Sequence, residues 1–413
     1  MRVLIAHNRY RSEQPSGENV VVDDEARLLA EHGCEVELLQ THSDEIADWP
    51  AHKKALLPAR TVWSRAGRRL VADAIERFRP DVVHVHNTFP LLSPTALRAA
   101  RASGAAVVAT MHNFRPLCSA ATFVRDGKVC TSCLGGGPLP GLVHGCYRDS
   151  RLATLPLAAT ISTHRLAGTW RNSVDRYVFP SAFARSLYVQ AGWAPERLVV
   201  KPNTAPEPGL TRNGSGRGFV ALSRFSDEKG LDTLLDAWRA AGLDEPLTMI
   251  GSGELDGELR ARAVGLANVE FAGRLSHSDA LARLAGARAL VVPSRWFEVF
   301  PRTIVEAYAL GVPVVASRLG SLADIVEDGV TGLQFEPDSP AGLVEALRTL
   351  ATADALTQQL GRQARRRYED ELAPGPTTRR LLEIYEDALA QAASSPVLEA
   401  VLDVGSTESP TWA

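Results

Sequence analysis

Residues 297–317 read FEVFPRTIVEAYALGVPVVAS and hold a loop, a helix and a strand in one short segment. We expect the helix to begin near residue 302, directly after Pro301, and to end at the Gly-Val-Pro break. The apolar run after the break is typical of a buried strand. Two glutamates, Glu298 and Glu306, are separated by seven residues, so the first lies in the loop and the second in the second helical turn.

The same alternation of short apolar runs and helical segments continues on both sides. In the C-terminal half it includes GFVALSRF, LDTLLDAWRAAG, PLTMIGSGE, VEFAGRLS and ALVVPSRWF. In the N-terminal half it includes RVLIAHN, ENVVVDDEARLLAEHG, CEVELLQ, DVVHVHN and AAVVATMHN. Continuous Val, Ile and Leu runs suit a parallel sheet that helices cover on both faces. The pattern predicts an α/β protein with two doubly wound, Rossmann-like parallel-sheet domains that face each other across a cleft.

A stretch rich in Pro, Gly, Ser and Asn, residues 206–218, is the predicted linker between the domains. We expect an N-terminal domain over residues 1–205 and a C-terminal domain over residues 206–376. A final helix over residues 377–393 has apolar residues at helical spacing and is expected to pack back on the N-terminal domain. Residues 394–413 are rich in Ser and Pro and are expected to be disordered.

The composition restricts the class of protein. The chain has 413 residues, 45% of them hydrophobic, which suffices for two or three packed domains. A formal net charge of -3 and a pI near 6.4 provide no basic surface for a nucleic-acid partner. The start, MRVLIAHN, lacks the apolar core of a signal peptide, and no stretch reaches about 18 uninterrupted apolar residues. We therefore expect a cytoplasmic protein.

Ligands of open α/β sheets bind beyond the carboxyl ends of the strands, where this chain has charged and glycine-rich loops. Arg224 and Lys229 lie five residues apart in one such loop, so both side chains can approach one diphosphate. Gly251 and Gly253 allow close approach of the backbone after a strand. The helix that begins near Thr303 offers free N–H groups to an anion.

Glu298 and Glu306 are predicted to face the same cleft. A carboxylate that accepts hydrogen bonds from two neighbouring hydroxyls is a common way to hold a ribose or another sugar. The pair therefore indicates sugar recognition. Each charge also has a structural interpretation, because the two cations could be solvated and Glu298 could serve only the helix dipole.

With these motifs the chain resembles the family 4 retaining glycosyltransferases of the GT-B architecture. The similar segments of the C-terminal half include SRFSDEKGLDTLLDAW, GSGE, EVFPRTIVEAYALGVPVVAS and DIVEDGVTGLQF. Those of the N-terminal half include SGENVVVDDEARLLAEHGCEVELL, PDVVHVHN, TMHN and VDRYVFPSAFARSLYVQAGW. The resemblance covers nearly the whole chain. It implies a hexosyltransferase of glycan biosynthesis that moves a sugar from a nucleotide-sugar donor to an acceptor hydroxyl.

The resemblance also implies a role for each site residue. Arg224 and Lys229 would neutralise the leaving diphosphate without a catalytic metal, and the sequence has no Asp-x-Asp motif to hold a cation. Glu306 would bind the ribose, Glu298 the donor hexose, and His112 of TMHN the sugar hydroxyls. The remaining donor contacts would come from the base-side residues Arg274 and Leu275 and from Phe300, Pro301, Arg302 and Thr303 beside the hexose and phosphates.

Gly17, in SGEN, corresponds to a glycine loop near the donor phosphates, where the family often has two adjacent glycines and this chain has Ser16.

His84 and His86 share one strand face, which favours packing or support over catalysis. The alternative for His112 is a buried histidine with a structural role only. In the family that the chain resembles, retention is usually explained by front-face attack, with the departing phosphate taking the acceptor's proton. A nucleotide-sugar epimerase and a non-catalytic sugar-nucleotide-binding protein stay open as alternatives.

Four of the five cysteines, Cys118, Cys130, Cys133 and Cys146, fall within one 29-residue segment that includes a C-x2-C. A structural zinc bound by all four would stabilise a loop rich in Gly and Pro. Four reduced thiols and redox-active pairs are the alternatives, and a reducing cytoplasm disfavours disulfides.

Arginine runs occupy residues 65–69 and 362–367, both on predicted helices. A solvated helix face is the default interpretation of such runs. Peripheral contact with anionic lipid at the inner face of a membrane, or with a polyanionic acceptor, is the alternative.

Overall fold

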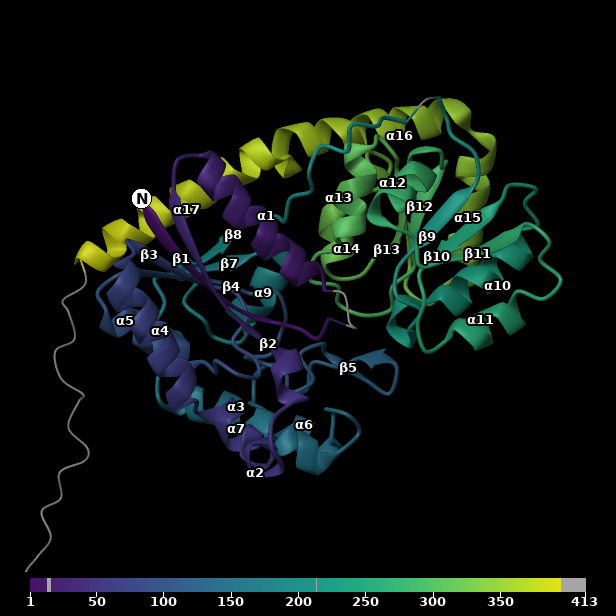
Figure 1. Cartoon of the computed structure of the whole chain (residues 1–413). Helices are drawn as coiled ribbons and strands as arrows, with labels where there is room; N and C mark the ends of the chain where they lie inside the picture. The colour runs from purple at the N-terminus through teal and green to yellow at the C-terminus, as the bar shows by residue number, and fades with distance from the viewer. Residues whose placement is uncertain (13–15, 213, 395–413) are drawn as a thin grey trace, which may run out of the picture.

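The computed structural model describes residues 1–12, 16–212 and 214–394 and contains two six-stranded parallel sheets (Figure 1). The N-terminal sheet has the strand order β2-β1-β3-β4-β7-β8, and the C-terminal sheet has the order β11-β10-β9-β12-β13-β14. Each order reverses beside its first strand, between β1 and β3 and between β9 and β12, as in doubly wound sheets. The predicted fold of two Rossmann-like domains is confirmed.

The strands are short, as expected for buried parallel sheets. Those of the N-terminal sheet are β1 (Arg2–Arg9), β2 (Glu35–His42), β3 (Val82–Val85), β4 (Ala106–Thr110), β7 (Arg176–Phe179) and β8 (Leu198–Val200). Those of the C-terminal sheet are β9 (Phe219–Leu222), β10 (Leu247–Ile250), β11 (Val269–Gly273), β12 (Ala289–Val292), β13 (Val314–Ser317) and β14 (Gly332–Phe335). A small antiparallel hairpin consists of β5 (Val124–Arg125) and β6 (Lys128–Val129).

Helices connect these strands. Those of the N-terminal half are α1 (Gly17–Glu31), α2 (Ala51–Ala55), α3 (Leu57–Val62), α4 (Arg65–Phe78), α5 (Thr95–Ala102), α6 (Leu139–His144), α7 (Arg151–Leu166), α8 (Thr169–Asn172) and α9 (Ala182–Gln190). Those of the C-terminal half are α10 (Leu231–Ala241), α11 (Asp256–Arg262), α12 (His277–Ala285), α13 (Arg302–Ala309), α14 (Ser321–Ile325), α15 (Pro340–Thr352), α16 (Asp354–Arg367) and α17 (Pro374–Ser394). Single-turn helices lie at Ser43–Ile46, Pro195–Arg197 and Asp227–Lys229, and a π-helical turn spans Tyr368–Leu372.

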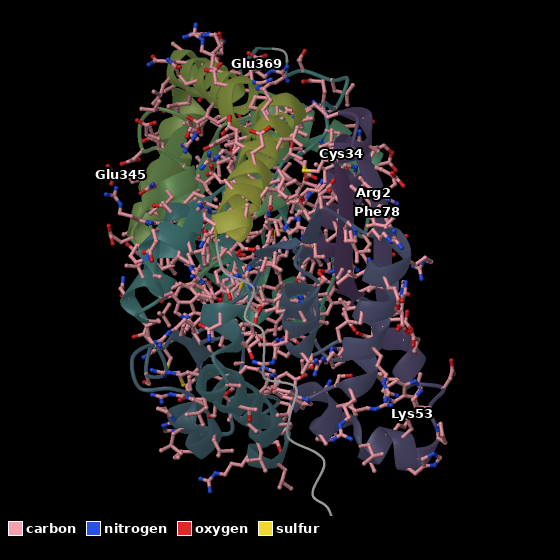
Figure 2. All side chains as sticks on the ribbon, turned by 90° about the vertical axis from the view of Figure 1, so that its left-hand side faces the viewer. Arg2, Cys34, Lys53, Phe78, Glu345 and Glu369 are labelled. Carbon is pink, nitrogen blue, oxygen red and sulfur yellow. The ribbon has the colours of Figure 1, made fainter. Side chains whose placement is uncertain are left out.

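Side chains alternate between the two faces of the N-terminal sheet, and each face has its own core. Leu4 and Val83 pack with α4 and α5 on one face, whereas Val3 and Ile5 pack with α1 and α17 on the other. On the α4 side, the Arg2 guanidinium lies 4.6 Å from the centre of the Phe78 ring (Figure 2). The C-terminal sheet is likewise covered on both faces by two separate clusters.

The last helix, α17, runs from the C-terminal domain along the N-terminal domain (Figure 1). Its residues Leu381, Ile384 and Tyr385 are buried against the N-terminal sheet. The helix begins at Pro374, three residues before the predicted start. Just before it, the Leu372 carbonyl accepts a hydrogen bond of 2.8 Å from Thr204 Oγ1, so the two connections between the domains lie side by side.

Both arginine runs lie on helices, as predicted. Two of the four arginines at residues 362–367 form ion pairs, because Arg365 bonds Glu207 and Glu369 and Arg367 bonds Glu371. None of the helices in the part of the chain that the structure describes has the length and apolar character needed to span a bilayer. Of the tail predicted to be disordered, residues 395–413 lie outside the described residues.

Candidate active site

The predicted site residues lie on loops at the carboxyl ends of the two sheets. Arg224 follows β9, Glu298 follows β12, and His112 follows β4 of the other domain. The domains meet beside these loops, because Arg302 Nη1 of α13 bonds Asp24 Oδ2 of α1 at 2.8 Å. Both side chains of this ion pair are largely buried, with 11% and 13% of their surface exposed. The carboxyl ends of the two sheets therefore meet at the domain interface, and we place the candidate site between these two walls.

Helix α13 begins at Arg302, directly after Pro301, as the sequence predicted. Glu306 accordingly lies in the second turn, and Glu298 lies in the loop before the helix. Both glutamates are buried, with 7% and 8% of their surface exposed. Buried carboxylates need polar partners. The partners of the two glutamates differ.

Glu298 is held by a lysine and a serine. Its Oε1 accepts hydrogen bonds of 2.6 Å from Lys229 Nζ and 2.7 Å from Ser294 Oγ. The Lys229 ammonium also lies 5.0 Å from the centre of the Trp296 ring. A partly buried cation and a buried carboxylate are therefore in contact at the end of β12.

Arg224 does not join this pair. Its Nη2 bonds Glu228 Oε1 at 2.6 Å, and 63% of its side chain is exposed. In this structure each of the two cations bonds its own carboxylate, and the expectation that both approach one diphosphate stays a prediction. The sequence analysis did not predict Glu228 as the partner of Arg224, although a separation of four residues was an available signal for an ion pair.

Glu306 is paired with a histidine that the sequence analysis also missed. His277 Nε2 lies 3.0 Å from Glu306 Oε1, and this hydrogen bond raises the pKa of His277. Arg302 Nη2 lies 3.9 Å from the same oxygen. The Glu306 carboxylate thus has one cationic neighbour from its own helix and one titratable partner from the start of α12. His277 lies two residues after Leu275, one of the predicted base-side residues, and this position was the available signal.

The two glycines after β10 are required by the chain's own packing. Gly251 has a φ of +137°, and a Cβ there would stand 1.9 Å from the Ser223 carbonyl oxygen. A Cβ on Gly253 would stand 2.2 Å from the Phe225 carbonyl oxygen. These contacts join the loops after β9 and β10, and the approach of both glycines to the donor stays a prediction.

Gly17 is the first residue of α1, and Ser16 accepts a hydrogen bond of 3.3 Å from the Glu18 backbone N–H as the N-cap. The serine that replaces a second glycine therefore caps the helix. A Cβ on Gly17 would stand 3.8 Å from Arg302 Cδ, so this loop faces the start of α13. The preceding residues 13–15 lie outside the described residues.

The other predicted donor residues flank the same sheet edge. Arg274 is exposed directly after β11, and Leu275 packs against the core of the C-terminal domain. Phe300 packs against that core from the loop before α13, and Thr303 lies in the first turn of the helix.

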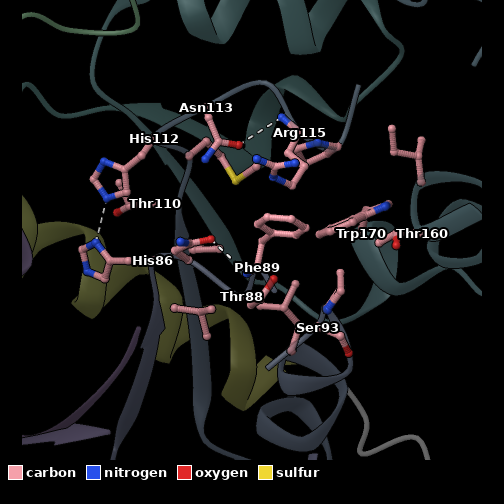
Figure 3. A pocket seen from close by; sticks show the side chains of 18 of the residues that line it. His86, Thr88, Phe89, Ser93, Thr110, His112, Asn113, Arg115, Thr160 and Trp170 are labelled. Atoms are coloured by element: carbon pink, nitrogen blue, oxygen red, sulfur yellow. Dashed lines mark hydrogen bonds between the residues drawn. The ribbon is translucent and has the colours of Figure 1, made fainter. Parts of the chain in front are cut away.

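On the N-terminal side, His112 belongs to a row of histidines. Its Nε2 lies 2.8 Å from His86 Nδ1, and burial holds the pKa of both imidazoles well below the usual value (Figure 3). Both rings are therefore neutral near pH 7, so one nitrogen of this contact donates and the other accepts. His86 thus fixes the orientation of His112, which is the supporting role predicted for it.

Behind His86 lies a buried network of residues far apart in sequence. His84 bonds Tyr385 Oη and Thr110 Oγ1, each at 2.7 Å, and Glu25 forms an ion pair with Lys201. Glu25, His84 and His86 have ligand atoms within 4.8 Å of one another, the spacing of a metal site. However, Lys201 pairs with the carboxylate and both ring nitrogens of His84 are hydrogen-bonded, so within this group only Glu25 Oε2 and His86 Nε2, 3.4 Å apart, are without a hydrogen-bond partner among the described residues.

Next to His112 a cavity opens in the N-terminal domain (Figure 3). Polar residues at its edge include Asn113 and Arg115, whose guanidinium carbon lies 4.0 Å from the centre of the Phe89 ring. The deeper wall is apolar and includes Val85, Leu97, Ala109, Leu157, Ile161, Trp170 and Tyr177. An amphipathic cavity of this kind suits an organic ligand with both polar and apolar parts.

Glu18, beside Gly17, is a buried acid that the sequence analysis missed. Burial raises its pKa to about 8, against the influence of the nearby Arg115. In the described structure, neither Glu18 Oε1 nor His7 Nδ1 has a hydrogen-bond partner, although they lie 4.0 Å apart. Unpaired buried polar atoms are costly, so they mark a place where a ligand hydroxyl could bond.

Two facing Rossmann-like domains, with buried acids and cations at the edge between them, define the GT-B class of enzyme architecture. Residues 15–205 match the family model described as Glycosyltransferase Family 4, and residues 208–367 match the model described as Glycosyl transferases group 1. The chain belongs to this family of glycosyltransferases.

Individual relatives are similar over part of the chain or at low identity. D-rhamnosyltransferase WbpZ of Pseudomonas aeruginosa is 36% identical over 154 residues, 36% of this chain and 39% of the relative. Glycogen synthase of Mycobacterium tuberculosis is 29% identical over 323 residues, 73% of this chain and 68% of the relative. The structure of HepE from Anabaena in complex with UDP has a TM-score of 0.63 at 17% identity, covering 94% of this chain and 100% of that chain. That likeness supports the fold.

Proposed function

We propose that the protein transfers a hexose or related sugar from a nucleotide-sugar donor to an acceptor hydroxyl, with retention of the anomeric configuration. The observation that carries this proposal is the contact between Lys229 and the buried Glu298, with Glu306 in the following helix. Membership of the family and the UDP bound to the similar structure of HepE support a nucleotide-sugar donor.

In this proposal the donor lies along the C-terminal sheet edge. Glu306 accepts hydrogen bonds from the ribose hydroxyls, while the hexose lies near Glu298. Lys229, released in part from Glu298, and Arg224, released from Glu228, supply positive charge to the diphosphate. The free N–H groups at the start of α13 face the same anion. These groups do the electrostatic work for which other enzymes use a divalent cation.

The acceptor lies in the cavity beside His112. The bond between the anomeric carbon and the diphosphate oxygen breaks, a bond from that carbon to the acceptor oxygen forms on the same face, and the departing phosphate takes the acceptor's proton. Neutral His112, oriented by His86, can donate or accept one hydrogen bond toward a sugar hydroxyl. The unpaired Glu18 Oε1 and His7 Nδ1 offer two further contacts.

Donor binding and transfer can be tested separately. Thermal unfolding should be measured with UDP, GDP, ADP and dTDP sugars, because a ligand at about 100 times its Kd stabilises by about 2.7 kcal/mol. The stabilising donor should then be supplied with candidate acceptors, and the anomeric configuration of the product read by NMR. An inverted product, or a free epimeric sugar formed without acceptor, would contradict the proposal. The cytoplasmic location and the peripheral membrane contact stay predictions.

A further inference from the structure

The segment between β4 and α7 brings together four thiols that the proposed chemistry does not use. Cys118, Cys130, Cys133 and Cys146 line one small cavity of about 10 Å³. Cys118 and Cys133 are buried, the other two are partly exposed, and all four are free cysteines. The sequence cluster is therefore also a cluster in space.

The backbone fixes these thiols from separate short elements. The N–H of Cys130, directly after β6, donates to the Phe123 carbonyl at 2.7 Å, and the N–H of Cys146, after α6, donates to the Gly141 carbonyl at 3.0 Å. A Cβ on Gly141 would stand 3.5 Å from Cys133 Sγ, so α6 packs directly on the C-x2-C turn. Hydrogen bonds thus fix the backbone of Cys130 and Cys146, while the sulfur atoms can still move by rotation of the side chains.

We propose that Cys118, Cys130, Cys133 and Cys146 bind one structural zinc ion. Four thiolates form a closed tetrahedral zinc site with Zn–S distances of about 2.3 Å. The cavity is about the size of a single water molecule, so it has room for one ion and for no additional ligand. Among the described residues, only Glu25, His84 and His86 form a group of three or more ligands with all ligand atoms within 4.8 Å of one another, so zinc binding would bring the four sulfur atoms closer by rotation of the side chains. Metal binding releases the thiol protons.

A zinc ion here would stabilise a segment that has little regular secondary structure. Its regular structure is limited to the two-residue strands β5 and β6 and the six-residue helix α6. Phe114 and Phe123 anchor it in the N-terminal core, and the metal would join the rest of the segment to them. Loops of this composition in small zinc-binding domains are ordered by the metal.

The segment also connects the two walls of the site. It begins at His112 and Arg115 of the acceptor cavity, and Cys133 lines the adjoining cavity of about 420 Å³. At the tip of the hairpin, a Cβ on Gly127 would stand 3.2 Å from Asp227 Oδ2, in the turn that leads to Lys229. The zinc would thus order a hairpin that reaches the donor side. This functional consequence, unlike the metal site itself, rests on the proposed function.

The test begins with the metal content of the full chain, purified under reducing conditions without chelator. We expect about one zinc per chain by elemental analysis. Refilling the chelated protein with Co²⁺ should give the intense absorption of cobalt–thiolate bonds. A metal content near zero together with no Co²⁺ spectrum, or a disulfide between these cysteines found by mass spectrometry, would overturn the proposal.

Variants then assign the ligands. Cys118→Ser and Cys133→Ser should each lose the zinc, whereas Cys34→Ser, at the free cysteine next to β2, should keep it. His144→Ala is the sharper control, because His144 lines the same cavity but is not one of the four proposed ligands. Loss of zinc in His144→Ala, or its retention in both serine variants, would refute the four-cysteine site. Co²⁺ binding to the folded wild type keeps the test valid if a variant fails to fold, and none of these readouts requires glycosyl transfer.

Discussion

Glu298 and Glu306 should respond differently to the same isosteric substitution. Glu298 contacts Lys229 and, in our proposal, the reacting hexose, where charge develops as the glycosidic bond stretches. Glu298→Gln should therefore lower kcat by roughly 100- to 1000-fold, the range measured when one electrostatic partner of a transition state is removed. Glu306 faces the ribose, whose contacts are nearly equal in the ground and transition states. Glu306→Gln should raise the donor KM roughly 10- to 100-fold, equivalent to 1.5–3 kcal/mol for hydrogen bonds to a charged group, with little change in kcat.

The structure also sets the stability cost of each change. Glu298→Gln leaves Lys229 beside a neutral amide, and only 18% of the lysine side chain is exposed. We expect a loss of about 1–3 kcal/mol in the free energy of unfolding. Glu306→Gln removes the partner of His277, whose side chain is 62% exposed, so its cost should be smaller. Glu270→Gln is a matched control, because that glutamate forms an exposed ion pair with Arg283 in the same domain.

Steady-state kinetics with varied donor at saturating acceptor would decide, with thermal unfolding of each variant measured alongside. If both variants changed only KM, or if Glu298→Gln matched the control, the proposed division between hexose and ribose would be wrong. A double-mutant cycle with Lys229→Met isolates the ion pair. A coupling free energy near zero would show that the two groups act independently.

Three further predictions concern the cation, the domain interface and pH. Transfer should persist in EDTA and gain nothing from magnesium or manganese, because Arg224 and Lys229 supply the positive charge; strict dependence on either cation would contradict this. The buried pair of Arg302 and Asp24 should give a coupling free energy of about 1–3 kcal/mol in a double-mutant cycle of thermal unfolding, and zero coupling would show that the interface does not depend on it. Burial lowers the pKa of His112 below its unfolded value of 6.5, so the folded state binds fewer protons. Stability is then full above pH 6.5 and falls as the pH drops below it; His112→Gln should flatten that fall, and an unchanged slope would refute the assignment.

Short-range sequence patterns were sufficient to predict which strands, helices and loops surround the site. The proline before α13 placed the helix start correctly, and with it the second-turn position of Glu306. Short apolar runs between helices gave two parallel sheets, because only such sheets bury strands on both faces. The loops at the carboxyl ends of the strands then followed from the general position of ligand sites in such folds.

Side-chain partners were not predictable in the same way. The Arg224 guanidinium can bond either a ligand or the Glu228 carboxylate, and in the described structure it bonds the glutamate. The network behind His112 depends on residues such as Lys201 and Tyr385, which are 176 and 301 positions from their partners. The spacing of residues in the sequence does not indicate such long-range contacts, because these contacts form only when separate helices and strands pack together.

The return of α17 to the N-terminal domain has a consequence for biosynthesis. Val3 and Ile5 belong to β1, yet α17, which covers their face together with α1, begins only at Pro374 and is translated much later. At 5–20 residues per second, the synthesis of residues 201–385 takes on the order of ten to forty seconds. During that interval the nascent first domain exposes an apolar sheet face, and His84 lacks Tyr385. A ribosome-bound or truncated chain is therefore a natural substrate for chaperones, and a premature stop before residue 377 would expose this face permanently.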